Sequence, residues 1–241
     1  MFEPVWQVNT LPVSEIFGPT IQGEGPFSGC RAMFVRLGGC NLSCSWCDTP
    51  YSWDATRFDL RKEITSTPVA AILESVASAE GIVVVTGGEP LMHAHTAGFR
   101  ELVAGIRARK AQVHIESNGT LLPPPDILEM LDVIVLSPKL PNAGAHKAHQ
   151  SPAIDERWPK VAHRQEVHLK VVCVDEDDVS RAAKLAEDFG WPVSRVWVMP
   201  EAVSADTLAQ RWTRIAEAAI HHGLNVTSRL HVVAWGDSRG R

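Results

Sequence analysis

The sequence has 241 residues, a net charge of −5, 45% hydrophobic residues and 21% charged residues, values close to those of ordinary globular proteins. This balance excludes a disordered or fibrous chain, and the lack of a basic block gives no reason to expect nucleic acid as a partner. No apolar run reaches the roughly 20 residues that cross a membrane, and the first ten residues lack the features of a signal peptide. We therefore expect one cytoplasmic domain over residues 1–241, without a membrane partner.

Short β-branched runs alternate with amphipathic stretches along the chain, a pattern typical of a parallel sheet with helical crossovers. Two helices have recognisable ends. Residues 68–79 follow Thr67 as a cap, with Pro68 at the first helical position, and residues 175–189 end before Gly190. Residues 141–159, rich in His, Ala and Gly, are expected to form a long loop. The candidate strands are residues 32–37, 82–86, 112–116, 133–137, 167–173, 195–199 and 230–234.

Small and polar residues follow most of these candidate strands. Gly38 and Gly39 follow the first, Gly87 and Gly88 the second, and Ser117 and Asn118 the third, with further polar residues after the fourth and sixth. In parallel α/β folds the chemistry gathers at the carboxyl ends of the strands. The sequence therefore predicts a site at this end of the sheet.

Three of the five cysteines, Cys40, Cys44 and Cys47, lie within eight positions. They can hold three corners of a four-iron cluster and leave the fourth iron open to a substrate. The spacing alone also fits a zinc site or a four-thiolate cluster whose last ligand is Cys30 or Cys173. Clustered cysteines of this kind indicate a metal site in a reducing compartment and not a disulfide framework.

With Trp46 as the aromatic residue before the last cysteine, this spacing resembles the signature of the radical S-adenosylmethionine (SAM) superfamily. The glycine-rich segment at residues 87–90 resembles the segment that approaches the methionine amino group in that superfamily. The resemblance implies a [4Fe-4S] cluster, SAM bound to its open iron, and cleavage of SAM to a 5′-deoxyadenosyl radical. It implies an incomplete or distorted parallel (β/α) barrel, which the candidate runs would build from six to seven strands.

Further motifs resemble the family of 7-carboxy-7-deazaguanine synthases. The matching segments are residues 15–25, 36–41, 47–49, 86–90, 117–120 and 137–139, and the first is the most specific. This resemblance implies radical ring contraction of 6-carboxy-5,6,7,8-tetrahydropterin to 7-carboxy-7-deazaguanine with loss of ammonia, a lyase reaction of queuosine and deazapurine biosynthesis. The short N-terminal segment would then bind the substrate.

A pterin is a flat ring edged with donors and acceptors, and a buried polar site can read such an edge strictly. Arg36, as a planar guanidinium, suits the substrate carboxylate. Thr49 is implied as a ligand of Mg²⁺, which keeps waters and takes substrate oxygens for the rest of its shell. Without the resemblance, Asp48 and Thr49 read as a loop cap. The implied substrate-binding residues are Ile21, Gln22, Gly23, Glu24, Arg36, Thr86 and His231.

The resemblance also implies where SAM is held. Residues 199–202 depart from the glutamine-led segment that the family has at this place, which weakens the assignment of individual contacts there. The implied cofactor-binding residues are Trp46, Gly88, Glu89, Ser117, Ser137, Pro138, Lys139, Met199, Pro200, Glu201 and Ala202.

Other histidines and one lysine receive no catalytic role. His231 lies in the last candidate strand and is expected to face the substrate, although a lone strand histidine is more often a core residue, as His114 and His168 are expected to be. Lys170 lies mid-strand and is left unassigned. The remaining histidines read as surface or loop residues: His93, His95, His146, His149, His163, His221 and His222.

The resemblance implies a homodimer and a low-potential electron donor such as flavodoxin or ferredoxin. Two alternatives remain at this stage. A glycyl-radical-enzyme activase shares the three cysteines but does not need the Gln22–Glu24 motif or Arg36, and a non-catalytic zinc or iron–sulfur module would hold metal without SAM.

Overall fold

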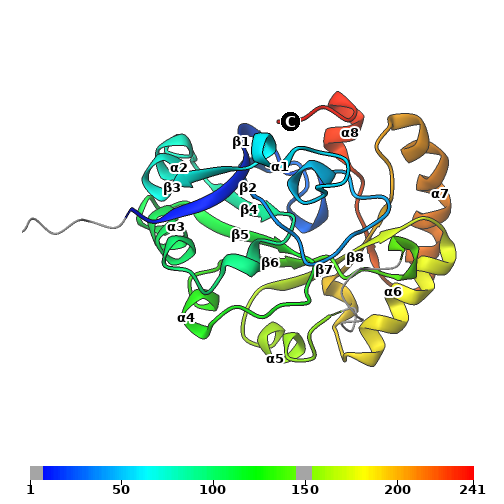
Figure 1. Ribbon diagram of the computed structural model, residues 1–241. Coiled ribbons are helices and arrows are strands. Elements are labelled where there is room, and N and C mark those ends of the chain that lie inside the picture. The colour runs from blue at the N-terminus through cyan, green and yellow to red at the C-terminus, as the bar shows by residue number, and fades with distance from the viewer. Residues whose placement is uncertain (1–7, 145–153) are drawn as a thin grey trace, which may run out of the picture.

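The computed structural model describes residues 8–144 and 154–241. Within them, one sheet of nine strands has the order β3-β1-β2-β4-β5-β6-β7-β8-β9 (Figure 1). His146, His149 and the centre of the predicted loop at 141–159 lie outside the described residues. The strands are β1 Thr10–Ile21, β2 Arg31–Leu37, β3 Thr65–Pro68, β4 Ile82–Gly87, β5 Gln112–Ser117, β6 Val133–Leu136, β7 Val167–Cys173, β8 Val196–Pro200 and β9 Asn225–Val226.

The strands from β2 to β9 are parallel, whereas β1 pairs antiparallel with both β2 and β3. The sheet curves but does not close, and the longer helices lie around its outside (Figure 1). The predicted incomplete barrel is therefore confirmed. The helices are α1 Leu60–Glu63, α2 Val69–Ser75, α3 Ala97–Ala108, α4 Pro125–Leu128, α5 Trp158–Ala162, α6 Glu176–Asp188, α7 Ala205–His221 and α8 Leu230–Trp235.

Strand β4 shows why these runs form a two-faced sheet. Val83 and Val85 are fully buried in the main core with Phe99 and Leu102 of α3. Their neighbours Ile82 and Val84 point to the other face, where they join a small cluster with Phe34 of β2. Because alternate residues of a strand face opposite sides, a β-branched run without polar interruption fits a sheet that is covered on both faces. Each such buried side chain contributes about 1.5–3 kcal/mol.

Six of the seven predicted strands are present within two residues of their expected ends. The prediction at 230–234 is wrong, since these residues lie in helix α8, where Val232 is buried and Val233 is 58% exposed. A five-residue apolar run is too short to separate the helical from the strand period. The seventh parallel strand is instead the short β9, and the antiparallel strands β1 and β3 were not predicted.

The predicted helix ends have mixed outcomes. Asp175 caps α6, with its side chain accepting a hydrogen bond from the Asp178 backbone N–H, and Gly190 follows with φ of +62°, as expected. Thr67 is not a helix cap: it lies in β3, and its hydroxyl donates to the Thr65 carbonyl. Pro68 takes the N-cap position of α2 in its place.

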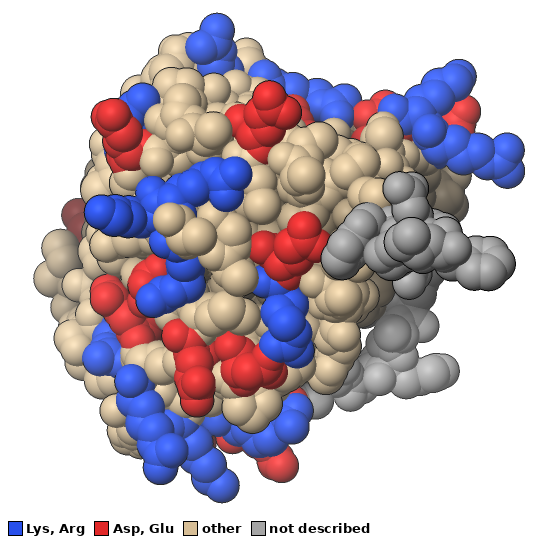
Figure 2. Space-filling view, turned by 90° about the vertical axis from the view of Figure 1, so that its left-hand side faces the viewer, with Lys and Arg blue, Asp and Glu red and all other residues tan. Residues whose placement is uncertain are grey.

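The face in Figure 2, the side drawn on the left of Figure 1, has Lys and Arg side chains among Asp and Glu side chains. This mixture accords with the small net charge of −5. Among the described residues, no helix has the length and apolar character needed to cross a membrane.

Candidate active site

A cavity of about 250 Å³ opens at the carboxyl ends of the strands, where the sequence predicts the site. Most of the predicted residues line it, whereas Gly23, Glu89, Pro138, Pro200 and Ala202 do not. The predicted residues that line the cavity are Ile21, Gln22, Glu24, Arg36, Cys40, Cys44, Trp46, Cys47, Thr49, Thr86, Gly88, Ser117, Ser137, Lys139, Met199, Glu201 and His231.

Cys40, Cys44 and Cys47 share one wall of this cavity, on the loop that follows β2. Cys30 and Cys173 do not line it; Cys30 is exposed, and the fully buried Cys173 thiol faces the Val171 carbonyl at 3.6 Å. Burial raises the pKa of Cys40 to about 12 and also raises the pKa of Cys44. Metal binding to these thiols would therefore release protons.

Hydrogen bonds hold the cysteine loop in place. The Gly39 N–H donates to the Ser52 carbonyl at 2.7 Å, and the Trp46 indole N–H donates to the Asn142 carbonyl at 3.0 Å. The Trp53 indole N–H lies 3.3 Å from the Cys47 sulfur, and the Leu42 N–H lies 3.4 Å from the Cys40 sulfur. Two of the three sulfurs thus accept hydrogen bonds from the protein.

A four-iron cluster and a single metal ion place different demands on the three thiols. A mononuclear zinc site needs all of its thiolates at about 2.3 Å from one point. Among residues 8–144 and 154–241, no group of three or more His, Cys, Asp or Glu side chains is arranged to hold one ion. A four-iron cluster instead takes one thiolate at each of several iron corners. The donor set of the loop, three thiols on one cavity wall, fits that requirement.

The glycine-rich loop after β4 packs tightly against the cysteine loop. A side chain at Gly88 would overlap the Gly39 carbonyl, and Gly39 itself has φ of +92°, which favours glycine. The Glu89 N–H donates to that same carbonyl at 2.8 Å. Glycine at both positions therefore allows the backbones of the two loops to meet beside the cavity.

Glu89 lies beneath the cavity and does not line it. Its fully buried carboxylate accepts hydrogen bonds from the Leu91 N–H at 2.9 Å, the Ser117 hydroxyl at 2.9 Å and the Asn118 N–H at 2.7 Å. Burial raises the pKa of Glu89 above its ordinary value. The structure thus gives this side chain a contact with the loops after β4 and β5, while the predicted contact with SAM stays a prediction.

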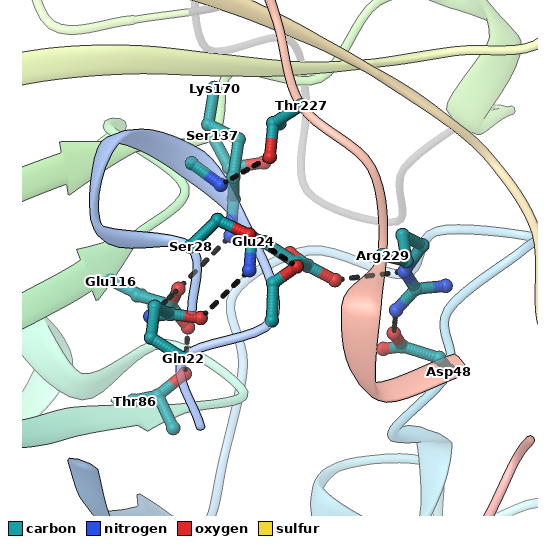
Figure 3. Close-up of polar contacts among 12 residues, drawn as sticks. Gln22, Glu24, Ser28, Asp48, Thr86, Glu116, Ser137, Lys170, Thr227 and Arg229 are labelled. Atoms are coloured by element: carbon teal, nitrogen blue, oxygen red, sulfur yellow. Dashed lines mark hydrogen bonds and ion pairs between the residues drawn. The ribbon is translucent and has the colours of Figure 1, made fainter. Parts of the chain in front are cut away.

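A cluster of buried polar side chains lies around Lys170 of β7, which also lines the cavity (Figure 3). The Lys170 ammonium donates to Glu24 at 2.6 Å and to Glu116 at 3.0 Å. Glu116 also accepts hydrogen bonds from Gln22 at 3.2 Å and from Thr86 at 3.1 Å. Gln22, Glu24 and Thr86, three of the predicted substrate residues, therefore belong to one network.

Charge balance keeps Glu24 and Lys170 ionised. Burial alone would raise the pKa of Glu24, but Lys170, Arg229 and His231 together hold it well below its ordinary value of 4.5. Burial alone would lower the pKa of Lys170. The nearby carboxylates of Glu116 and Glu24 have the larger effect, so the pKa of Lys170 lies above 10.5. The Glu24 carboxylate can therefore accept hydrogen bonds from a ligand at neutral pH.

A second ion pair lies at the mouth of the cavity. The Nε of Arg36 donates to Glu15 at 3.2 Å, and the Tyr51 hydroxyl donates to the same oxygen at 3.2 Å. The Arg239 guanidinium lies 3.7 Å from the centre of the Tyr51 ring. Arg36 is thus paired with Glu15 and is not a solvated charge at the end of the strand.

His231 lies in helix α8, and not in a strand as predicted, yet it faces the cavity. Its Nε2 is 3.7 Å from Glu24, and burial lowers its pKa below 6.5. A side chain at Gly23 would overlap the His231 ring. The N-terminal segment therefore comes close to the C-terminal helix because residue 23 is glycine.

The segments expected to hold SAM line the other side of the cavity. The Lys139 ammonium donates to the Ser137 carbonyl at 2.6 Å and to its hydroxyl at 2.8 Å, and lies 5.7 Å from the centre of the Trp46 ring. In the segment 199–202, Met199 and Glu201 line the cavity, and Arg211 of α7 donates to Glu201.

Several cavity residues were missed by the sequence prediction. The motif from 15 to 25 contained Glu15, and Glu116 could have been noticed as a charged residue at the carboxyl end of the predicted strand 112–116. Lys170 and Arg229 carried no signal of their own, because their partners lie up to 205 positions away in the sequence. The missed residues that line the cavity include Glu15, Asp48, Tyr51, Trp53, Glu116, Lys170 and Arg229.

The class of protein follows from comparison with known families. Residues 34–210 match the family model of the Radical SAM superfamily, so the chain belongs to this superfamily. The structure resembles that of QueE from Escherichia coli, with a TM-score of 0.64 at 22% identity over 92% of this chain and 95% of that one. It also resembles Streptococcus suis SuiB bound to S-adenosylmethionine, with a TM-score of 0.53 at 16% identity over 78% of this chain and 48% of that one.

Curated relatives narrow the assignment within the superfamily. The chain is 39% identical to 7-carboxy-7-deazaguanine synthase of Pyrobaculum aerophilum, over 95% of this chain and 96% of the relative. It is 35% identical to the enzyme of the same name from Hyperthermus butylicus, over 92% of each chain. The chain is a member of the 7-carboxy-7-deazaguanine synthase family.

Proposed function

We propose that the chain converts 6-carboxy-5,6,7,8-tetrahydropterin to 7-carboxy-7-deazaguanine by radical SAM ring contraction with loss of ammonia, as a lyase that serves queuosine biosynthesis and so tRNA modification. The observation that carries this proposal is that three cysteines and the network of Gln22, Glu24 and Glu116 line one cavity. Family membership supports it, since the relatives carry this activity in their names.

Cys40, Cys44 and Cys47 would hold the cluster, and the cluster with SAM would supply one-electron reduction and hydrogen-atom removal. The protein's own part is to hold the pterin. The carboxylate of Glu24 and the amide of Gln22 suit the guanidine-like edge of the ring, and Arg36 suits its carboxyl group. Such a buried polar surface favours a small planar substrate over the protein backbone that a glycyl-radical-enzyme activase modifies.

The proposal is tested with protein purified and reconstituted without oxygen. Brown protein with about four irons per chain should convert the pterin, after reduction and with SAM present, to a product with the mass of 7-carboxy-7-deazaguanine. The Cys44→Ala variant is the control and should give no product. Colourless parent protein with stoichiometric zinc, or iron-loaded protein that cleaves SAM but leaves the pterin unchanged, would contradict the proposal.

We include Mg²⁺ in the proposed reaction, with Thr49 as its protein ligand. Thr49 lines the cavity, and its hydroxyl lies 3.7 Å from the Cys47 sulfur. Asp48 is already paired with Arg229, so waters and substrate oxygens would complete the shell of the ion.

Thr49→Ala should raise the magnesium concentration needed for half-maximal turnover, because it removes the hydroxyl ligand. Cluster content and SAM cleavage without substrate should stay near those of the parent, and Thr49→Ser should restore the magnesium response. The measurement is a magnesium titration of turnover for all three proteins. Superimposable curves for the parent and Thr49→Ala, with intact clusters, would remove Thr49 from the metal site.

Arg36→Ala should reduce kcat/KM for the pterin far more than it weakens SAM binding. Loss of a charge-assisted pair in a closed site costs on the order of 2–5 kcal/mol. Glu15 keeps its hydrogen bond from Tyr51 in this variant, so its charge is not left without a donor. Steady-state kinetics and a SAM titration measure the two effects, with Arg31→Ala on the exposed part of the same strand as the control. Equal losses for both ligands would contradict the assignment.

Trp53→Phe should shift the reduction potential of the cluster to a more negative value. Hydrogen bonds to the cluster sulfurs raise this potential, and the Trp53 indole is the donor to Cys47. A spectroelectrochemical titration measures the shift, and Trp235→Phe, at a partly exposed tryptophan of α8, is the control. An unchanged potential in a fully loaded Trp53→Phe protein would mean that this contact is absent from the loaded enzyme.

We also propose that the chain forms a homodimer and receives electrons from a low-potential donor such as flavodoxin or ferredoxin. The edge strands β3 and β9 of the open sheet support a dimer, because exposed edges are commonly covered by a partner. Light scattering on the reconstituted protein tests the dimer, and reduction of the cluster by each donor tests the electron source.

A further inference from the structure

The guanidinium of Arg229 joins three separate segments of the chain, two of which, at Glu24 and Asp48, line the cavity (Figure 3). This residue precedes helix α8 and is 6% exposed. Its Nε donates to Glu24 at 2.8 Å, one terminal nitrogen donates to the Ala202 carbonyl, and the other donates to Asp48. Each of the three nitrogens of one rigid, planar group is thus bound to a different segment.

Each of the three segments has its own place in the proposed reaction. Glu24 belongs to the segment that would read the pterin edge. Asp48 directly follows the cluster ligand Cys47. Ala202 ends the segment 199–202, which is expected to contact SAM. Arg229 therefore connects the segment that would bind the pterin to the segments that would hold the cluster and SAM.

The charges around Arg229 alternate along a single chain of contacts. From Asp48 through Arg229 to Glu24, and on through Lys170 to Glu116, every negative group is paired with a positive one. Arg229 carries one positive charge and shares it between two carboxylates. A ligand that donates hydrogen bonds to Glu24 holds the carboxylate to which Arg229 is bound, and so acts on how Arg229 binds Asp48 and the Ala202 carbonyl.

We propose that Arg229 is a positioning residue that couples pterin binding to SAM binding, an inference that rests on the proposed function. Pterin bound at Glu24 fixes the guanidinium plane, which in turn fixes the loop of Cys47 and the segment of Ala202 around SAM. A planar guanidinium can hold three acceptors in fixed directions, whereas the ammonium of lysine is a point charge. Coupling of this kind is reciprocal, so SAM must favour pterin binding by the same factor.

The test measures the dissociation constant of SAM on cluster-loaded protein, with and without saturating pterin. In the parent, pterin should tighten SAM binding by about 5- to 150-fold, the usual range for coupled sites. In Arg229→Lys the factor should fall toward one, and more SAM should be cleaved for each product formed. Arg211→Lys is the matched control, because Arg211 holds the adjacent Glu201 but its recorded bonds do not reach Glu24 or Asp48. Arg211→Lys should change the affinity for SAM, but pterin should tighten SAM binding by the same factor as in the parent.

The inference is overturned by a factor near one in the parent, or by the same factor in the parent and Arg229→Lys. Loss of the factor in Arg211→Lys as well would also overturn it, since the coupling would not belong to Arg229. If Arg229→Lys takes up no cluster, Asp48→Asn decides, and an undiminished factor there refutes the inference. Failure of the parent to bind or convert the pterin refutes the proposed function and this inference together, and is seen before any variant is compared.

Discussion

Replacing Cys40, Cys44 or Cys47 by alanine should abolish the cluster, whereas Cys30→Ala and Cys173→Ala should retain it. The first three thiols share the cavity wall, while Cys30 is exposed elsewhere and Cys173 is buried away from the cavity. A fourth protein thiolate would occupy the coordination site on the iron that SAM needs. Iron and sulfide content, with the absorption and EPR spectra of anaerobically reconstituted protein, measure the outcome.

The Cys30→Ala and Cys173→Ala variants are the matched controls for this experiment. Loss of the cluster in a folded Cys30→Ala or Cys173→Ala protein would show that a fourth thiolate is required. The open-iron site, and with it the proposed chemistry, would then be the wrong description of this cavity.

Lys170→Met should lower kcat/KM for the pterin and also destabilise the fold, because breaking a buried ion pair by removing one partner costs about 3–5 kcal/mol of stability. The variant leaves Glu24 and Glu116 without the ammonium that lies between them. Cluster content should not change, since Lys170 is not bonded to the cysteine loop. Lys184→Met, at an exposed surface pair with Asp188, is the control and should behave as the parent.

The pH profile separates a role in charge balance from simple packing. In the parent, the pKa of Glu24 is lowered, so its contribution to stability is present above its unfolded value of 4.5 and is lost as pH falls through its lower folded value. The pKa of Lys170 is raised, so its contribution is present below 10.5 and is lost as pH rises through its higher folded value. The network is therefore at full strength between these two unfolded values.

In Lys170→Met, burial acts on Glu24 without the opposing ammonium, so the pKa of Glu24 should rise. The KM for the pterin should then increase as pH falls within a range where the parent is unaffected. The measurement is the KM of parent and variant from weakly acid to weakly alkaline pH. Parallel profiles would show that Lys170 does not control the ionisation of the site.

Much of the fold was predictable because its strands are buried on both faces. Runs such as β4 and β7 contain consecutive β-branched residues, which few other structures accommodate. Strand β1 escaped prediction because Pro12, Gly18 and Pro19 interrupt it, and these residues ordinarily mark turns. Strand β9 has two residues, too few to form any pattern.

The site was predictable only where its residues are adjacent in sequence. The cysteine spacing and the motif from Gln22 to Glu24 are local signals, and both segments line the cavity. Lys170 and Arg229 depend on partners that the fold brings together from distant parts of the sequence. The residues next to each of them in the sequence do not reveal these partners. The strand predicted around His231 was wrong for a related reason, since the packing of α8 decided its conformation.

The cavity is closed by contacts between distant parts of the chain. The Leu230 N–H donates to the Gly23 carbonyl at 2.9 Å, and Arg229 and Glu24 are 205 positions apart. Contacts of such long range form slowly, because a large loop must be closed first. The sheet and the cysteine loop can therefore assemble in a newly made chain while this side is still open. Iron and sulfide would then have a free route to the three thiols, and the last contacts of folding would enclose the cluster.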